Sequence, residues 1–236
     1  MGKAALIAWR EIRWEIFGDR GAVLRTGFFA LLPIFFVLSS RGNTLGGSAD
    51  LAILTLALQS ALIPALSGVA LIASTFTQEK ENGTLVPLLA APVKDMDIVV
   101  GKLLGMVGPV MTICAGSLAV YYVLGSVLYG AARLQHALPF EILYAILVIA
   151  FLYLITAGSW VLIVAAVVRT TRAGQQIAGL MIGISAAVFG LLGVTAARIA
   201  DGWALVGLGI AFVAADIVAL EIARRVWRRS EVIGRL

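Results

Sequence analysis

Residues 140–168 read FEILYAILVIAFLYLITAGSWVLIVAAVV, and Glu141 is the one charged side chain in this stretch. An α-helix rises about 1.5 Å per residue, so about 20 apolar residues cross the roughly 30 Å hydrocarbon core of a bilayer. The whole chain is similarly apolar: 61% of its 236 residues are hydrophobic, 13% are charged, and its mean hydropathy is +1.02. Soluble domains hold about half apolar and a quarter charged residues. The sequence therefore excludes a water-soluble globule and predicts an all-α, polytopic membrane protein.

Five further apolar runs, each bounded by charge, predict a total of six transmembrane helices in a single domain covering residues 1–236. We place the six spans near residues 24–40, 51–76, 98–127, 140–168, 177–197 and 203–223. A lead segment (1–23), a polar segment (77–97) and a basic tail (224–236) lie outside them. Cys114 is the single cysteine, which excludes a disulfide framework and a multi-cysteine metal site. We interpret Cys114 as a small packing residue and His136 as a surface residue, so no metal site is expected.

The basic residues fall almost entirely on one side of the membrane if both termini are cytoplasmic. The outside loops then contain Arg41, Arg133 and Arg198. The fifteen inside residues are Lys3, Arg10, Arg13, Arg20, Arg25, Lys80, Lys94, Lys102, Arg169, Arg172, Arg224, Arg225, Arg228, Arg229 and Arg235. Lys and Arg near span ends are retained in the cytoplasm. This asymmetry predicts cytoplasmic N- and C-termini, and it explains the net charge of +5 without a nucleic-acid partner.

The lead segment has the pattern of an amphipathic helix. Ala5, Trp9, Ile12 and Ile16 share one helical face, while most of the charged side chains lie elsewhere. Tryptophan suits the headgroup level of a membrane. We favour a helix lying in the membrane interface over a solvated helix that leads into the first span.

The segment between the second and third spans is the most distinctive part of the sequence. Residues 77–102 read TQEKENGTLVPLLAAPVKDMDIVVGK. Gly83 interrupts the polar exit of the second span, and Thr84 is a suitable N-cap for a short apolar helix over residues 85–91. Pro92 ends that helix. An apolar helix with charged flanks on the cytoplasmic side indicates a docking surface for a partner.

This run resembles the signature of the type 2 permeases of ATP-binding-cassette (ABC) exporters. The resemblance lies in the acidic pair before Gly-Thr-Leu, the two leucines, the small residue before Pro, and a Gly-Lys that opens the next span, here Gly101-Lys102. The sequence departs from many members at Val86 and Pro87, where a glutamate commonly follows Gly-Thr-Leu. The resemblance implies a coupling helix that docks on a separate ATPase subunit. The coupling residues it implies are Glu79, Glu81, Gly83, Thr84, Leu85, Leu88, Leu89 and Pro92.

The resemblance also implies a multi-pass protein of the cell inner membrane that works as a homodimer or heterodimer of permease subunits in contact with lipid. The chain itself is not expected to be an enzyme or to bind a cofactor. A Walker loop needs Gly-Lys followed by Ser or Thr, but Lys3 precedes Ala4 and Lys102 precedes Leu103. ATP and Mg²⁺ are therefore expected on the partner subunit. The alternative for residues 77–97 is that their charges only form a solvated loop that fixes the topology of the chain.

Ionisable side chains inside the spans are few. A charge near the middle of a bilayer costs about 2.5 to 3.5 kcal/mol on insertion scales. Asp216 is the deepest, and it is a candidate pathway residue or the ion-pair partner of Arg169 or Arg172. Glu221 is placed to pair with Arg225 one turn later.

Two other function classes remain as alternatives. A stand-alone secondary carrier would concentrate acids at mid-membrane and show internal repeats, whereas Asp216 is the one candidate acid. An intramembrane enzyme would use Ser117 or Ser159 as a nucleophile, but the single histidine lies in an outside loop. Prolines inside the first three spans and two Gly-x-x-x-Gly pairs are interpreted as features of helix shape and packing.

Overall fold

The structure is a computed structural model, and every element it describes is an α-helix or a short connection between helices. It describes residues 3–11, 28, 31, 33–35, 38, 49–81, 95–167, 176, 179, 180, 183 and 203–226. The helices are α1 (Lys3–Glu11), α3 (Ala49–Glu81), α5 (Asp95–Tyr129), α6 (Ala131–Ala137), α7 (Phe140–Val167) and α9 (Trp203–Val226). The predicted all-α class is confirmed for this part of the chain.

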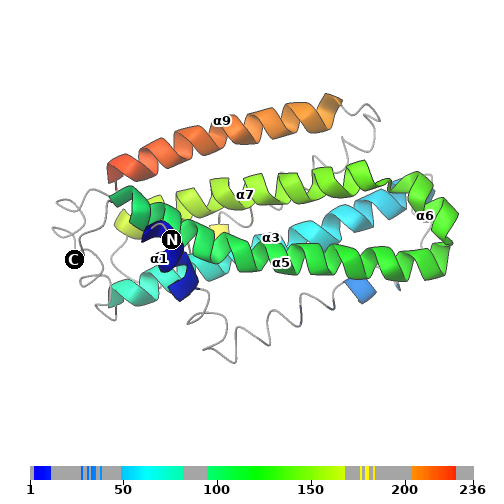
Figure 1. Cartoon of the computed structure of the whole chain (residues 1–236), viewed down its shortest axis with the longest axis horizontal. Coiled ribbons are helices and arrows are strands. Elements are labelled where there is room, and N and C mark those ends of the chain that lie inside the picture. The colour runs from blue at the N-terminus through cyan, green and yellow to red at the C-terminus, as the bar shows by residue number, and fades with distance from the viewer. Residues whose placement is uncertain are drawn as a thin grey trace.

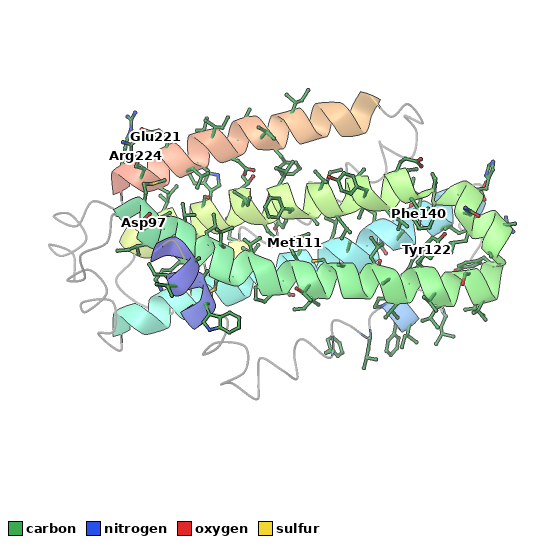
Figure 2. The ribbon with its side chains drawn as sticks, in the orientation of Figure 1. Asp97, Met111, Tyr122, Phe140, Glu221 and Arg224 are labelled. Atoms are coloured by element: carbon green, nitrogen blue, oxygen red, sulfur yellow. The ribbon has the colours of Figure 1, made fainter. Side chains whose placement is uncertain are left out.

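The four long helices α3, α5, α7 and α9 lie side by side as an elongated bundle (Figure 1). Helices α3, α7 and α9 run in one direction, and α5 runs in the other (Figure 1). We call the end of the bundle beside α1 the α1 end and the opposite end the α6 end. Figure 2 shows Asp97 and the Glu221–Arg224 pair at the α1 end, and Tyr122 beside Phe140 at the α6 end.

Three of the helices are long and apolar enough to cross a membrane. Their apolar stretches are Ala52–Val69 in α3, Met96–Tyr129 in α5 and Phe140–Val164 in α7. They match the predicted second, third and fourth spans, and α9 covers the predicted sixth span at residues 203–223. The predicted spans at 24–40 and 177–197, and the basic tail, lie largely outside the described residues. Those parts of the six-span arrangement stay predictions.

Helix α5 is longer than a bilayer is thick. Its 35 residues extend about 52 Å, against a hydrocarbon core of roughly 30 Å. Neighbouring helices cover the excess apolar surface. At the α1 end, Ile7 of α1 joins the buried cluster that contains Ile98, Val99 and Leu103 of α5. At the α6 end, Leu134 of α6 joins a second buried cluster around α5.

Helix α6 lies within residues 128–139, the predicted outside loop between the third and fourth spans. Gly130 makes the turn with φ of +87°, a left-handed conformation that suits glycine. The chain then folds back, so that Leu134 and Leu138 are fully buried against α3, α5 and α7. Arg133 of α6 lies 3.7 Å from Asp50 at the start of α3. Helix α6 has only 7 residues, which are too few to show the periodic apolar pattern of a helix in the sequence.

Helices α3 and α5 are joined by a polar contact that depends on a proline. Pro64 lies inside α3 and has no N–H, so the Ser60 carbonyl one turn earlier lacks its usual intrahelical donor. The Ser117 hydroxyl of α5 donates to that carbonyl oxygen at 2.7 Å, and both serines are fully buried. Pro64 is therefore accommodated because a neighbouring helix satisfies the freed carbonyl.

Two further contacts fix how α3 and α5 pack. The Tyr121 hydroxyl donates to the Ile53 carbonyl oxygen at 2.8 Å near the α6 end. Nearer the α1 end, a Cβ atom added to Gly68 would lie 2.5 Å from Cγ1 of Val110, so only glycine permits this approach. The helices are thus held in a single antiparallel register over much of their length.

Candidate functional site

The candidate coupling site lies between the end of α3 and the start of α5. Both helix ends, Glu81 and Asp95, are at the α1 end of the bundle (Figure 1). Glu79 and Glu81 belong to the last turn of α3, although the positions of their side chains lie outside the described residues. The other predicted coupling residues fall on residues 82–94, which also lie outside them: Gly83, Thr84, Leu85, Leu88, Leu89 and Pro92.

Helix α5, which follows this segment, is buried against other helices from its first turn. Ile98 and Val99 are each 1% exposed, and Leu103 one turn later is 4% exposed. They pack in one cluster with Ile7 of α1 and with Leu62 of α3. A displacement of the segment before α5 would therefore be transmitted to α5 and, through direct packing, to α1 and α3.

Lys102 is fully buried in this part of α5. Lys102 belongs to the family signature and to the predicted inside charges, and neither pattern predicts its burial. A buried ammonium group is stable only with polar or charged neighbours, and Lys102 does interact with a partner. The signal in the sequence was a lysine two turns into an apolar helix, with Val99, Leu103 and Met106 around it.

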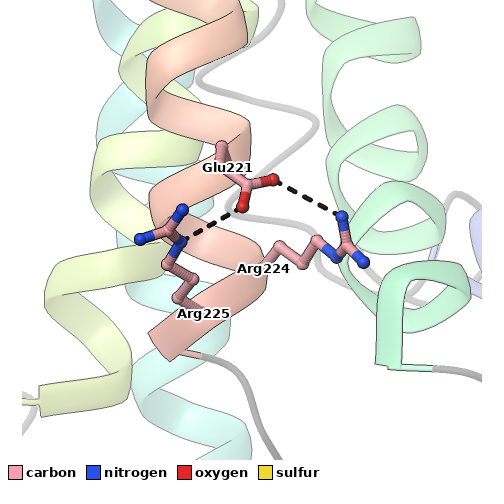
Figure 3. Close-up of polar contacts among 3 residues, drawn as sticks. All are labelled: Glu221, Arg224 and Arg225. Carbon is pink, nitrogen blue, oxygen red and sulfur yellow. Dashed lines mark hydrogen bonds and ion pairs between the residues drawn. The ribbon is translucent and has the colours of Figure 1, made fainter.

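The α1 end of α9 carries a cluster of three charges (Figure 3). Oε1 of Glu221 lies 3.1 Å from Nε of Arg225, and Oε2 lies 3.5 Å from an Nη atom of Arg224. All three side chains are substantially exposed, so each pair stabilises the helix only slightly. The predicted pairing of Glu221 with Arg225 is confirmed.

Asp216 lies on the buried face of α9, where it is 7% exposed. It is hydrogen-bonded to the Thr156 hydroxyl of α7. The sequence does not predict Thr156 as the partner of Asp216, because the two residues are 60 positions apart and share no local pattern. The predicted alternatives, Arg169 and Arg172, lie outside the described residues, so pairing with them stays a prediction.

The two candidate serine nucleophiles have different surroundings. Ser117 is engaged in the α3–α5 contact through its hydroxyl. Ser159 of α7 is fully buried, and its hydroxyl has no hydrogen-bond partner in the part of the chain that the structure describes. His136 is exposed on α6 at the α6 end of the bundle. The Ser117 hydroxyl thus holds α3 and α5 together.

Cys114 is fully buried in the apolar cluster, as the packing interpretation predicts.

Outward faces of the bundle carry apolar side chains on α9 and small residues on α5. On α9, Ile210 and Ile217 are 66% and 65% exposed. On α5, Gly108 and Gly116 have open space where a Cβ atom would lie, and Thr112 is exposed between them. Such faces suit lipid or another apolar helix rather than water.

Comparison with known proteins identifies a family. The sequence model of a protein family, described as ABC-2 family transporter protein, matches residues 28–221 of the chain. This range includes the candidate coupling segment, the α3–α5 contact and Asp216. No curated protein sequence matches the chain.

Proposed function

The chain belongs to the ABC-2 family of transporter proteins, and from this premise we propose that it is the permease subunit of an ABC exporter. In this proposal two six-span permease subunits, identical or homologous, form the substrate pathway in the cell inner membrane. A separate ATPase subunit binds ATP and Mg²⁺ and drives the cycle. The observation that carries the proposal is the family match over residues 28–221, which extends across nearly all described helices.

The lengths of α3 and α5 support a coupling role for residues 82–94. Helix α3 has 33 residues, about 50 Å at 1.5 Å per residue, which exceeds the hydrocarbon thickness by about 20 Å. Its last turn contains Glu79, Lys80 and Glu81, a composition suited to water rather than lipid. Two helices that project from the membrane would hold the segment between them at the distance where a soluble subunit docks.

Coupling then follows from packing. The apolar residues Leu85, Leu88 and Leu89 would enter a groove on the ATPase, while Glu79 and Glu81 would pair with basic groups at its rim. Movement of the ATPase would displace the start of α5, which is rigidly packed against α1 and α3. The interfacial position of α1, with Leu6 and Trp9 exposed, would let this helix slide along the membrane surface.

The direction of the helices supports six spans. Helix α7 ends at the α1 end and α9 begins at the α6 end, so residues 168–202 connect opposite ends of the bundle (Figure 1). Residues 12–48 likewise connect α1 to the far end, where α3 begins. One crossing in each connection gives six spans with both termini on the side of the coupling segment. The open faces of α5 and α9 leave room for a second permease subunit or for lipid.

Reversing the acidic charges beside the coupling segment tests the proposal. The double variant Glu79→Lys/Glu81→Lys is expected to insert into the membrane normally but to lose its ATPase companion and the ATP hydrolysis that accompanies it. Glu141→Lys is the matched control, because this exposed acid lies at the opposite end of the bundle. Hydrolysis and companion binding that survive in the double variant as well as in the control would refute the assignment of this segment.

A further inference from the structure

Asp216 of α9 is hydrogen-bonded to Thr156 of α7, and the position of the hydrogen in this contact determines the charge of the acid. Within the described part of the chain, the hydrogen-bond partner of Asp216 is Thr156. The charged residues that follow on α9, Glu221 with Arg224 and Arg225, bind one another at the α1 end. Among the residues that the structure describes, the contact of the buried Asp216 is thus a neutral hydroxyl group.

The Thr156 hydroxyl has two oxygen neighbours but only one hydrogen. Its Oγ1 lies 3.1 Å from the carbonyl oxygen of Leu152, one turn earlier in α7, a contact that helical threonines commonly make. Its second neighbour is Oδ1 of Asp216. The carbonyl oxygen accepts hydrogen bonds and never donates, and the same holds for an ionised carboxylate. If Asp216 were ionised, two acceptors would compete for one hydrogen.

We propose that Asp216 carries a proton in this arrangement, so that α7 and α9 are joined by a directed chain of hydrogen bonds. The acid donates to Oγ1 of Thr156, and the Thr156 hydroxyl donates to the Leu152 carbonyl oxygen. The Thr156 hydroxyl then accepts one hydrogen bond and donates one, so its single hydrogen is no longer shared between two acceptors. The site between these two helices binds a single proton.

The surroundings of Asp216 favour a neutral acid. Toward the α6 end, Phe212 of α9 meets Tyr153 of α7 edge-to-face, with ring centroids 6.4 Å apart. Toward the α1 end, Ala219 and Ala223 are fully buried. Aromatic rings and alanine methyl groups do not solvate a carboxylate. The titratable or charged side chains on the described helices packed against α9 are Glu141, Tyr144 and Tyr153 on α7, and Asp97, Lys102, Cys114, Tyr121, Tyr122 and Tyr129 on α5.

The contact between α7 and α9 forms only while Asp216 is protonated. If the two helices separate and water enters, the proton leaves to water, and the ionised Asp216 opposes closure until a proton returns. This contact is a proton-dependent latch between the predicted fourth and sixth spans. Because it rests on residues of this chain alone, it stands independently of the ATPase partner.

Infrared spectroscopy of the purified full chain, with any companion subunit and in lipid at pH 7, tests the latch. A protonated carboxylic acid has a C=O stretching band that ionised carboxylates lack. We expect this band in the wild type, its loss in Asp216→Asn and its retention in Glu221→Gln. Thr156→Val, which removes the acceptor of the acid, is expected to shift the band to higher frequency, whereas Thr156→Ser leaves it in place. A wild-type spectrum without the band, or a band that Asp216→Asn leaves unchanged, overturns the proposal.

Thermal unfolding provides a second test. Asp216→Asn offers an uncharged N–H donor to Thr156, so its melting temperature is expected to stay near that of the wild type. Asp216→Ala removes the contact and is expected to lower the melting temperature by several degrees. Equal loss in both variants would show that the negative charge matters, as in a pair with Arg169 or Arg172, and would overturn the latch. If Asp216→Asn fails to insert, the wild-type and Thr156→Val spectra still decide the question.

Discussion

The sharpest structural prediction concerns the proline-dependent contact between α3 and α5. Ser117→Ala removes the hydroxyl that donates to the Ser60 carbonyl oxygen at 2.7 Å. Because Pro64 has no N–H, this carbonyl then has neither an intrahelical nor an interhelical donor. Ser126→Ala is the matched control, since the exposed Ser126 hydroxyl donates at 2.7 Å to Val123 of its own helix.

The expected magnitude follows from two general values. Interhelical hydrogen bonds in membrane proteins contribute about 0.6 kcal/mol on average and at most about 1.7. A buried acceptor left without a donor costs about 1 to 3 kcal/mol. Since the Ser60 carbonyl is left with no donor, we expect Ser117→Ala to lower the free energy of unfolding by about 1 to 2 kcal/mol. Ser126→Ala should change it by less than about 0.5 kcal/mol.

A double-mutant cycle separates this mechanism from a simple loss of packing. Pro64→Ala restores an N–H at position 64 that bonds the Ser60 carbonyl within α3. In that background the further change Ser117→Ala should cost less than about 0.5 kcal/mol, which gives a coupling energy of about 1 kcal/mol. The assay is equilibrium unfolding of the purified chain in mixed detergent micelles. An equal cost of Ser117→Ala with and without Pro64 would refute the reasoning.

Two other substitutions test the packing of the bundle. Gly68→Leu is expected to destabilise the chain by about 1 to 3 kcal/mol, because even a Cβ atom there would lie 2.5 Å from Val110; the same change at Gly116, where the space is open, should have little effect. Leu134→Ala is expected to cost about 2 to 5 kcal/mol because this side chain is fully buried beneath α6, whereas Gln135→Ala, beside it on the exposed face, should be nearly neutral in the same unfolding assay.

The sequence predicts the long helices well because lipid imposes a simple rule on them. Apolar runs of sufficient length mark α3, α5, α7 and α9 to within a few residues. The helices extend past the predicted spans because nothing in Gln78–Glu81 breaks a helix before Gly83, and because acids such as Asp95 suit a helix N-terminus. Helix formation is a backbone property and does not stop where the apolar side chains end.

The contacts between helices could not be predicted in the same way. From the sequence Ser117 is only a candidate nucleophile, whereas in the structure its hydroxyl donates to the Ser60 carbonyl oxygen that Pro64 leaves without a donor. The role of Asp216 as a pathway or ion-pair residue stays a prediction, and its contact with Thr156 depends on how α7 and α9 are aligned. Lys102 is one of the predicted inside charges, and its full burial in α5 depends on how the neighbouring helices pack. The surroundings of these three residues depend on tertiary packing, which leaves no local pattern in the sequence.

The most direct test of the proposed function is to purify the tagged chain from its native membranes in mild detergent, identify stoichiometric companions and assay ATP hydrolysis. We expect a companion with a Walker loop, bound in a complex that hydrolyses ATP, and we expect both to be lost in Glu79→Lys/Glu81→Lys but kept in Glu141→Lys. A stable chain with no ATPase companion and no hydrolysis would contradict the account and would favour a stand-alone carrier in which Asp216 binds the coupling ion.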